Sequence, residues 1–89
     1  MRFEWDSGKA AENLRKHRVS FDEAATAFFD PLSMTVPDPD HSVVERRFIT
    51  MGASSGGRLL VVAHTERGST LRIISARLAS ASERKRYET

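Results

Sequence analysis

The N-terminal part of the chain is patterned as a short strand followed by a helix. Polar and apolar residues alternate over 2–5, as they do in a half-buried strand. A helix is expected to begin at Asp6 or Ser7, either of which can accept a hydrogen bond from the first turn, and to end near His17. Its apolar stripe is narrow, so most of this helix is expected to face water.

A second helix has the clearest pattern in the sequence. Ser20 and Glu23 fit a capping box, in which each side chain bonds the backbone N–H of the other residue. Asp30 and Pro31 are expected to end this helix. Apolar residues recur at helical spacing and are expected to pack in the core: Phe21, Ala24, Ala25, Phe28 and Phe29.

The rest of the chain is patterned as four strands and a terminal helix. The strands are expected at 32–36, 45–52, 58–66 and 70–77. The helix begins at a second capping box, Ser80 with Glu83, and runs to about Glu88. The resulting order, β-α-α-β-β-β-β-α, predicts an α+β fold in which helices pack on an antiparallel sheet. With 89 residues, the chain is expected to form one domain, 1–89.

The last two strands form a hairpin whose register can be predicted. Gly68-Ser69 fits a two-residue type II′ turn, with glycine at the first central position. The cross-strand pairs expected from this turn are Thr65 with Arg72, His64 with Ile73, and Leu60 with Arg77. In this register one sheet face carries His64, Ile73, Ser75 and Arg77.

Two pairs of residues in these strands suit chemistry on a phosphate ester. An imidazolium at His64 can protonate a leaving oxygen, and Arg77 can bind phosphate. The structural alternative makes His64 a half-buried strand residue with one hydrogen bond and pairs Arg77 with a carboxylate. Likewise, Glu45 and Arg47 share a strand face, either as a general base beside a phosphate clamp or as a surface ion pair worth under about 1 kcal/mol.

Charge is unevenly distributed along the chain. Residues 1–42 hold five Lys or Arg against eight Asp or Glu, a net −3, whereas 43–89 hold nine against four, a net +5. Eleven of the fourteen cations are arginine, whose planar fork of donors suits phosphate and stacks on bases. A basic half beside an acidic half indicates that the partner is a polyanion or a protein of opposite charge.

Composition excludes several classes of site. The chain has no cysteine, which rules out disulfides, thiolate zinc sites and cysteine nucleophiles and makes a reducing cytoplasm the expected location. Its three histidines lie far apart and follow no known ligand spacing, so neither a metal nor another cofactor is expected. No apolar run approaches the roughly 20 residues of a membrane span, and no signal-peptide pattern opens the chain.

A series of motifs covers nearly the whole chain. They are F-x-W-D-x-x-K, N-x-x-K-H and V-x-F-x-E-A near the start, then DPDHSVVERRF, RIISAR and a closing E-R-x-x-Y. With these motifs the sequence resembles the BrnT toxins of type II toxin–antitoxin systems. The resemblance implies a RelE-like fold and a ribonuclease that slows growth when it is free. It also implies a BrnA-type antitoxin with a DNA-binding ribbon-helix-helix domain. Two toxins and an antitoxin dimer would form a heterotetramer that reaches operator DNA only through the antitoxin.

One residue departs from the pattern of these toxins. They usually have glycine after Lys-His, where this chain has Arg18. Glycine at that position suits a left-handed helix C-cap. Arginine in the same conformation costs roughly 1 kcal/mol, so the helix end is expected to be strained or shaped differently.

The candidate residues fit a metal-independent cleavage of RNA. The 2′-OH attacks the adjacent phosphate, while the protein removes its proton, stabilises the crowded phosphate and protonates the leaving 5′ oxygen. We assign phosphate binding to Arg77 and Arg47, and proton transfer to Glu45 or His64. Further RNA contacts are expected from Lys16, His17, Arg72 and Arg84. Two other interpretations stay open: a non-catalytic module that binds RNA or the ribosome, and an interaction subunit whose basic surface receives an acidic antitoxin segment.

Overall fold

The helices and strands follow the predicted order. The computed structural model describes residues 1–38 and 46–88. Its elements are β1 (Arg2–Glu4), α1 (Ser7–His17), α2 (Phe21–Thr26), the 3₁₀ turn η1 (Ala27–Phe29), β2 (Met34–Pro37), β3 (Arg47–Ala53), β4 (Leu59–Arg67), β5 (Thr70–Leu78) and α3 (Ala81–Glu88). The predicted α+β class is confirmed. None of the helices in the described part of the chain combines the length and hydrophobicity that a membrane span requires.

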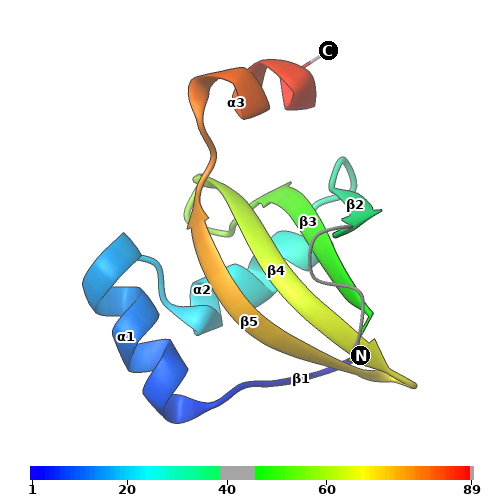
Figure 1. The fold of residues 1–89 in the computed structure, drawn as a ribbon. Coiled ribbons are helices and arrows are strands. Elements are labelled where there is room, and N and C mark those ends of the chain that lie inside the picture. Colours follow the sequence, from blue (N-terminus) through cyan, green and yellow to red (C-terminus); the bar gives the residue numbers. More distant parts are fainter. Residues whose placement is uncertain (39–45, 89) are drawn as a thin grey trace.

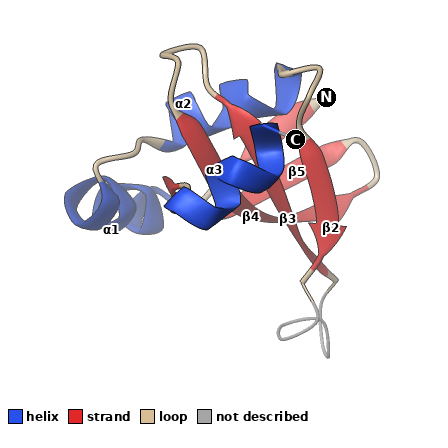
Figure 2. Ribbon diagram, turned by 90° about the horizontal axis from the view of Figure 1, so that it is seen from above, coloured by secondary structure: helices blue, strands red, loops and turns tan. Residues whose placement is uncertain are grey.

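One five-stranded sheet organises the molecule, in the order β1-β5-β4-β3-β2. The four later strands are antiparallel, as predicted, but β1 runs parallel to β5. No hairpin joins β1 to its neighbour, so no tight turn imposes an antiparallel direction. Helix α1 lies beside the β5 edge, and α2 and α3 lie on opposite sides of the sheet (Figure 1 and Figure 2).

The core lies between α2 and the sheet face that this helix covers. Val19, Phe21 and Ala24 are buried there against side chains of β4 and β5. The predicted core stripe is therefore correct at its first positions, but it is wrong at Phe29, which is 70% exposed. The cause is η1, because a 3₁₀ turn has three residues per turn instead of 3.6 and rotates Phe29 off the buried stripe.

Side-chain caps start both N-terminal helices. Asp6 Oδ2 accepts from the Lys9 N–H at 2.9 Å, and Ser20 Oγ accepts from the Glu23 N–H at 3.0 Å. The second bond predicted for this capping box, from the Ser20 N–H to the Glu23 carboxylate, is wrong. The carboxylate is instead bound by Arg58, whose Nε donates to it at 2.9 Å. This ion pair lowers the pKa of Glu23 and ties α2 to the start of β4.

Asn13 closes the part of the β5 edge that β1 leaves unpaired. β1 pairs with β5 only at 70–72. From α1, the buried Asn13 amide donates to the Ala76 carbonyl at 2.8 Å and accepts from the Ala76 N–H at 3.1 Å. The same amide donates to the Val19 carbonyl at 2.9 Å. One side chain thus takes the place of a neighbouring strand and fixes α1 against the sheet.

Candidate functional site

A β-bulge in β5 decides which arginines share a face. The confirmed cross-strand pairs are Thr65 with Arg72 and His64 with Ile73. Beyond them, the register shifts and Ile74 is an extra residue in β5. Arg77 consequently lies opposite Val61, and the prediction that it faces Leu60 is wrong.

The bulge has two consequences for the site. Successive strand residues point to opposite faces, so positions 72 and 77 of a regular strand would point apart. With one extra residue between them, Arg72 and Arg77 point to the same face. For the same reason Arg77 and His64 point to opposite faces, so the prediction that they share one is wrong.

The surface that carries both arginines is the sheet face turned away from α2, which we call the open face. Its residues form three cross-strand rows: Glu4, Arg72, Thr65 and Arg47; then Ser75, Ala63, Ile49 and Val36; then Arg77, Val61, Met51 and Met34. In the first row Arg47 and Arg72 lie on either side of Thr65, about 10 Å apart at normal strand spacing. Arg77 lies in the third row, roughly 13 Å further along the strands.

A carboxylate of α3 holds Arg77 in place. The guanidinium Nη1 and Nη2 donate to the two Glu83 oxygens at 2.8 and 2.9 Å. Glu83 also accepts from the Ser80 N–H at 2.8 Å, and its own N–H bonds the Ser80 hydroxyl, so this predicted capping box is complete. The Arg77 guanidinium is the main cause that lowers the pKa of Glu83 to about 2. The alternative that paired Arg77 with a carboxylate is therefore confirmed.

The first row of the open face presents two further guanidinium groups. Arg72 Nη1 donates to Glu4 Oε2 at 2.8 Å. Arg47 begins β3 and is half-buried. Thr65, between them, is buried, and its hydroxyl has no hydrogen-bond partner among the described residues. Two arginines thus lie on either side of a buried hydroxyl that bonds none of the described residues.

His64 lies in the core and not on the open face. It is fully buried, with its ring 4.9 Å from the Phe28 ring and 5.9 Å from the Phe48 ring, measured between centroids. Its Nε2 bonds Thr50 Oγ1 at 2.7 Å, and Thr50 bonds Thr35 at 2.7 Å. Burial lowers the pKa of His64 to about 4, so the imidazole is neutral at pH 7. The geometry is that of a core histidine with a hydrogen bond to a neighbouring strand.

Burial of His64 predicts a loss of stability on acidification. The folded protein holds this imidazole neutral down to about pH 4, whereas the unfolded chain protonates it near pH 6.5. Protons therefore favour the unfolded state across this window, and the free energy of unfolding should fall by about 3 kcal/mol as pH drops from 6.5 to 4. Urea unfolding at closely spaced pH values measures the slope.

The control for this prediction is His64→Gln, which keeps an amide to bond Thr50 but cannot titrate. Its unfolding free energy should stay nearly flat between pH 6.5 and 5, because the stability that comes from the lowered pKa of carboxylates such as Glu23 and Glu83 is lost only as pH falls through about 4.5, where the unfolded chain protonates them. An equal slope in the wild type and the variant would contradict the account.

The other predicted RNA contacts lie at the borders of the open face. Lys16 and His17, in the last turn of α1, line a shallow depression beside β5 together with Ser75. Arg84 is exposed on α3. Glu45, predicted for proton transfer, lies outside the described residues. The structure therefore gathers arginines on one face and adds basic groups at its two sides.

Sequence reasoning missed the apolar part of the open face. In β3, Ile49 and Met51 point to this face, while Phe48 and Thr50 point to the core. A strand with apolar side chains on both faces is typical of a strand that is covered on both sides. The signal was therefore present in the sequence of β3.

Comparison with known proteins identifies the family. The model of the family described as "Ribonuclease toxin, BrnT, of type II toxin-antitoxin system" matches residues 5–83. This chain belongs to the BrnT family. The crystal structure of the Brucella abortus ribonuclease toxin BrnT is similar to 90% of this chain and 97% of that chain, with a TM-score of 0.70 and 25% sequence identity. No curated protein sequence matches this chain significantly.

Membership in the BrnT family fixes the class of protein. It makes the chain a ribonuclease toxin of a type II toxin–antitoxin system, and such a system supplies an antitoxin as partner. The resemblance seen in the motifs is thus confirmed, and the fold agrees with that of the Brucella toxin. The likeness to RelE toxins stays a prediction.

Arg18 occupies a left-handed backbone conformation, which favours glycine. Its φ of 59° and ψ of 32° lie in the left-handed region, and its N–H bonds the Leu14 carbonyl at 2.9 Å. The Arg18 carbonyl in turn accepts from Arg58 Nη2 at 3.0 Å. The helix end thus keeps the shape of a left-handed cap and carries its strain.

Replacing Arg18 with glycine should relieve that strain. We expect Arg18→Gly to raise the free energy of unfolding by about 1 kcal/mol, because glycine adopts positive φ without a Cβ clash. Chemical denaturation of both proteins measures the difference. Arg18→Ala keeps the Cβ and serves as the control, so a gain of equal size in Arg18→Ala would show that strain is not the cause.

Proposed function

We propose that this protein cleaves RNA on its open face, by attack of a 2′-OH on the adjacent phosphate and without a metal ion. The observation that carries the proposal is the bulge at Ile74, since it puts Arg72 and Arg77 on the face of Arg47. Guanidinium groups can supply the positive charge that the crowded phosphate of the transition state needs. Membership in the BrnT family supports the reaction class.

Arg77 and Arg47 are proposed to bind phosphate, with Arg72 as a further contact to the strand. Arg77 already donates from Nη1 and Nη2 to Glu83, and a phosphate uses the same fork of donors. Phosphate therefore has to replace Glu83 when RNA binds at Arg77. This exchange makes α3, which carries Glu83, the element that responds to RNA.

Glu45 is proposed for proton transfer in preference to His64. Glu45 is the carboxylate that lies two residues before Arg47 in the sequence. The imidazole of His64 is enclosed in the core and packs edge to face against Phe28, so a substrate on the open face does not reach it. Its proposed role is to hold β4 against β3 through Thr50.

Basic residues at the borders are proposed to guide the rest of the RNA strand. Lys16 and His17 lie beside the β5 edge, next to Ser75 of the open face. Arg84 lies on α3, one residue beyond Glu83. An RNA strand that crosses Arg77 would meet Lys16 and His17 on one side and Arg84 on the other. Such contacts to phosphate make RNA binding dependent on salt.

The antitoxin is proposed to be of the BrnA type. The support is the resemblance of the motifs, which implies a ribbon-helix-helix protein, a complex of two toxins with two antitoxins, and contact with operator DNA only through the antitoxin. The absence of cysteine fits a protein that works in the reducing cytoplasm.

The test uses RNA oligonucleotides and the purified protein in EDTA. Attack by the 2′-OH leaves a 2′,3′-cyclic phosphate and a 5′-OH, and a 2′-deoxy nucleotide at the cleaved position should block the reaction. Cleavage that survives the 2′-deoxy substitution would exclude this mechanism. Salt-sensitive binding with no cleavage would favour a docking module instead.

A further inference from the structure

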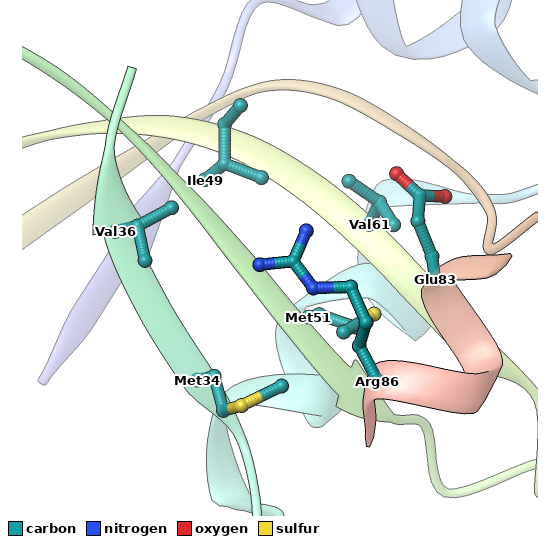
Figure 3. A pocket seen from close by; sticks show the side chains of 7 residues that line it. All are labelled: Met34, Val36, Ile49, Met51, Val61, Glu83 and Arg86. Carbon is teal, nitrogen blue, oxygen red and sulfur yellow. The ribbon is translucent and has the colours of Figure 1, made fainter. Parts of the chain in front are cut away.

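The open face contains an apolar groove between the strands and α3 (Figure 3). Its volume is about 500 Å³. The floor is made of side chains from three neighbouring strands: Met34, Val36, Ile49, Met51 and Val61. Met34 and Val36 are 41% and 54% exposed, although both are apolar. A contiguous apolar floor of this kind is typical of a surface that another molecule covers.

Helix α3 overhangs the groove but does not fill it. No residue of α3 is buried. Its contacts with the rest of the chain include two polar tethers, Glu83 to Arg77 and the Tyr87 hydroxyl to the Asp30 carboxylate. A helix with a polar surface all round has no apolar side to offer the floor. The floor is therefore left for an occupant from outside the described chain.

Helix α3, which contributes Glu83 and Arg86 to the rim of the groove, carries three cations and two anions. The guanidinium of Arg86 projects from α3 over the floor (Figure 3). Arg84 and Lys85 precede it on the same helix, and Glu83 is neutralised by its pair with Arg77. A second copy of this chain is a poor occupant, because a two-fold interface would bring the cations of α3 against themselves. An occupant with acidic side chains is complementary.

We propose that this groove docks a segment of the antitoxin in which apolar side chains are flanked by acidic ones. The apolar side chains cover the floor at Val36 and Met51, and a carboxylate pairs with Arg86. The inference rests on the toxin–antitoxin part of the proposed function, and none of the residues substituted to test it is assigned to RNA cleavage. RNA fits the floor less well, because none of the five floor residues has an aromatic ring on which a base can stack.

The test measures the affinity of the purified toxin for the antitoxin of the same operon by calorimetry. Val36→Gln replaces an exposed floor side chain without adding charge, and we expect it to weaken binding roughly 10- to 100-fold. Leu14→Gln is the matched control, since Leu14 is 49% exposed on α1, and its affinity should stay within about 2-fold. Arg86→Glu, on an exposed helix surface, should weaken binding by a similar factor and reduce its salt dependence.

Each possible outcome supports or overturns the proposal. Unchanged antitoxin affinity in folded Val36→Gln and Arg86→Glu would overturn it. Loss of RNA binding by Val36→Gln with full antitoxin affinity would assign the groove to RNA. A dimer of the toxin alone that Val36→Gln dissociates would assign it to a second copy. The experiment measures antitoxin binding, so it tests the groove even if the toxin does not cleave RNA. A failure of the docking proposal can therefore be told apart from a failure of the proposed cleavage.

Discussion

Replacing Arg77 with alanine is expected to lower RNA cleavage at least about 100-fold and to abolish growth arrest. The expected size is that of removing one charged group that stabilises a transition state. Arg77 is 46% exposed and its bonds with other residues are at the surface, so the variant should fold. Antitoxin binding should persist, because the floor of the groove is intact. Induction in cells and kinetics on purified RNA measure the two effects.

Glu83→Gln is the matched variant for this prediction. Glutamine keeps the capping box with Ser80 but loses the charge that pairs with Arg77. Cleavage by Glu83→Gln should equal or exceed that of the wild type, because phosphate then has a weaker competitor for the guanidinium. Arg15→Ala removes an exposed arginine of α1 and should have no effect. A folded Arg77→Ala protein that is fully toxic would refute the assignment.

Replacing Asn13 with alanine is expected to cost about 4 kcal/mol of stability. The change removes three hydrogen bonds and leaves the Ala76 N–H, the Ala76 carbonyl and the Val19 carbonyl without their partner in a buried site. A loss of this size is a large part of the total stability of a small domain. Urea unfolding, followed by circular dichroism, measures it.

The neighbouring residue provides the control for Asn13. Glu12→Ala changes an exposed side chain of the same helix and should alter stability by less than about 0.5 kcal/mol. A loss below about 1 kcal/mol in Asn13→Ala would mean that water satisfies Ala76 as well as the amide does. In that case α1 would not act as the closing edge of the sheet.

Local signals in the sequence were sufficient to predict the order of the helices and strands and the first residues of most helices. The Asp6 cap, the Ser80 capping box and the Gly68-Ser69 turn depend on residues within four positions of each other, so their chemistry can be read directly. The structure differs from the prediction where a side chain bonds a residue that is far away in the sequence. Arg58 binds the Glu23 carboxylate, which therefore does not cap its own helix. The two residues are far apart in the sequence, so no local pattern predicts this contact.

The candidate site was predicted in its residue types but not in its arrangement. The excess of arginine led us to assign Arg77 and Arg47 to phosphate and Arg72 to a further RNA contact, and these assignments stay predictions. The common face of these arginines depends on one inserted residue, Ile74, and a regular register gives the opposite result for Arg77. His64 was assigned to the site for a different reason, since its strand position alone does not say which face the helices cover.

The most direct test of the central claim is cleavage of naked RNA in EDTA by the wild type beside Arg77→Ala. The account predicts products with 2′,3′-cyclic phosphate ends from the wild type, and at least about 100-fold less product from a variant with the same circular dichroism and melting temperature. Equal cleavage by both proteins would contradict it, because the open face would then not be where the phosphate reacts.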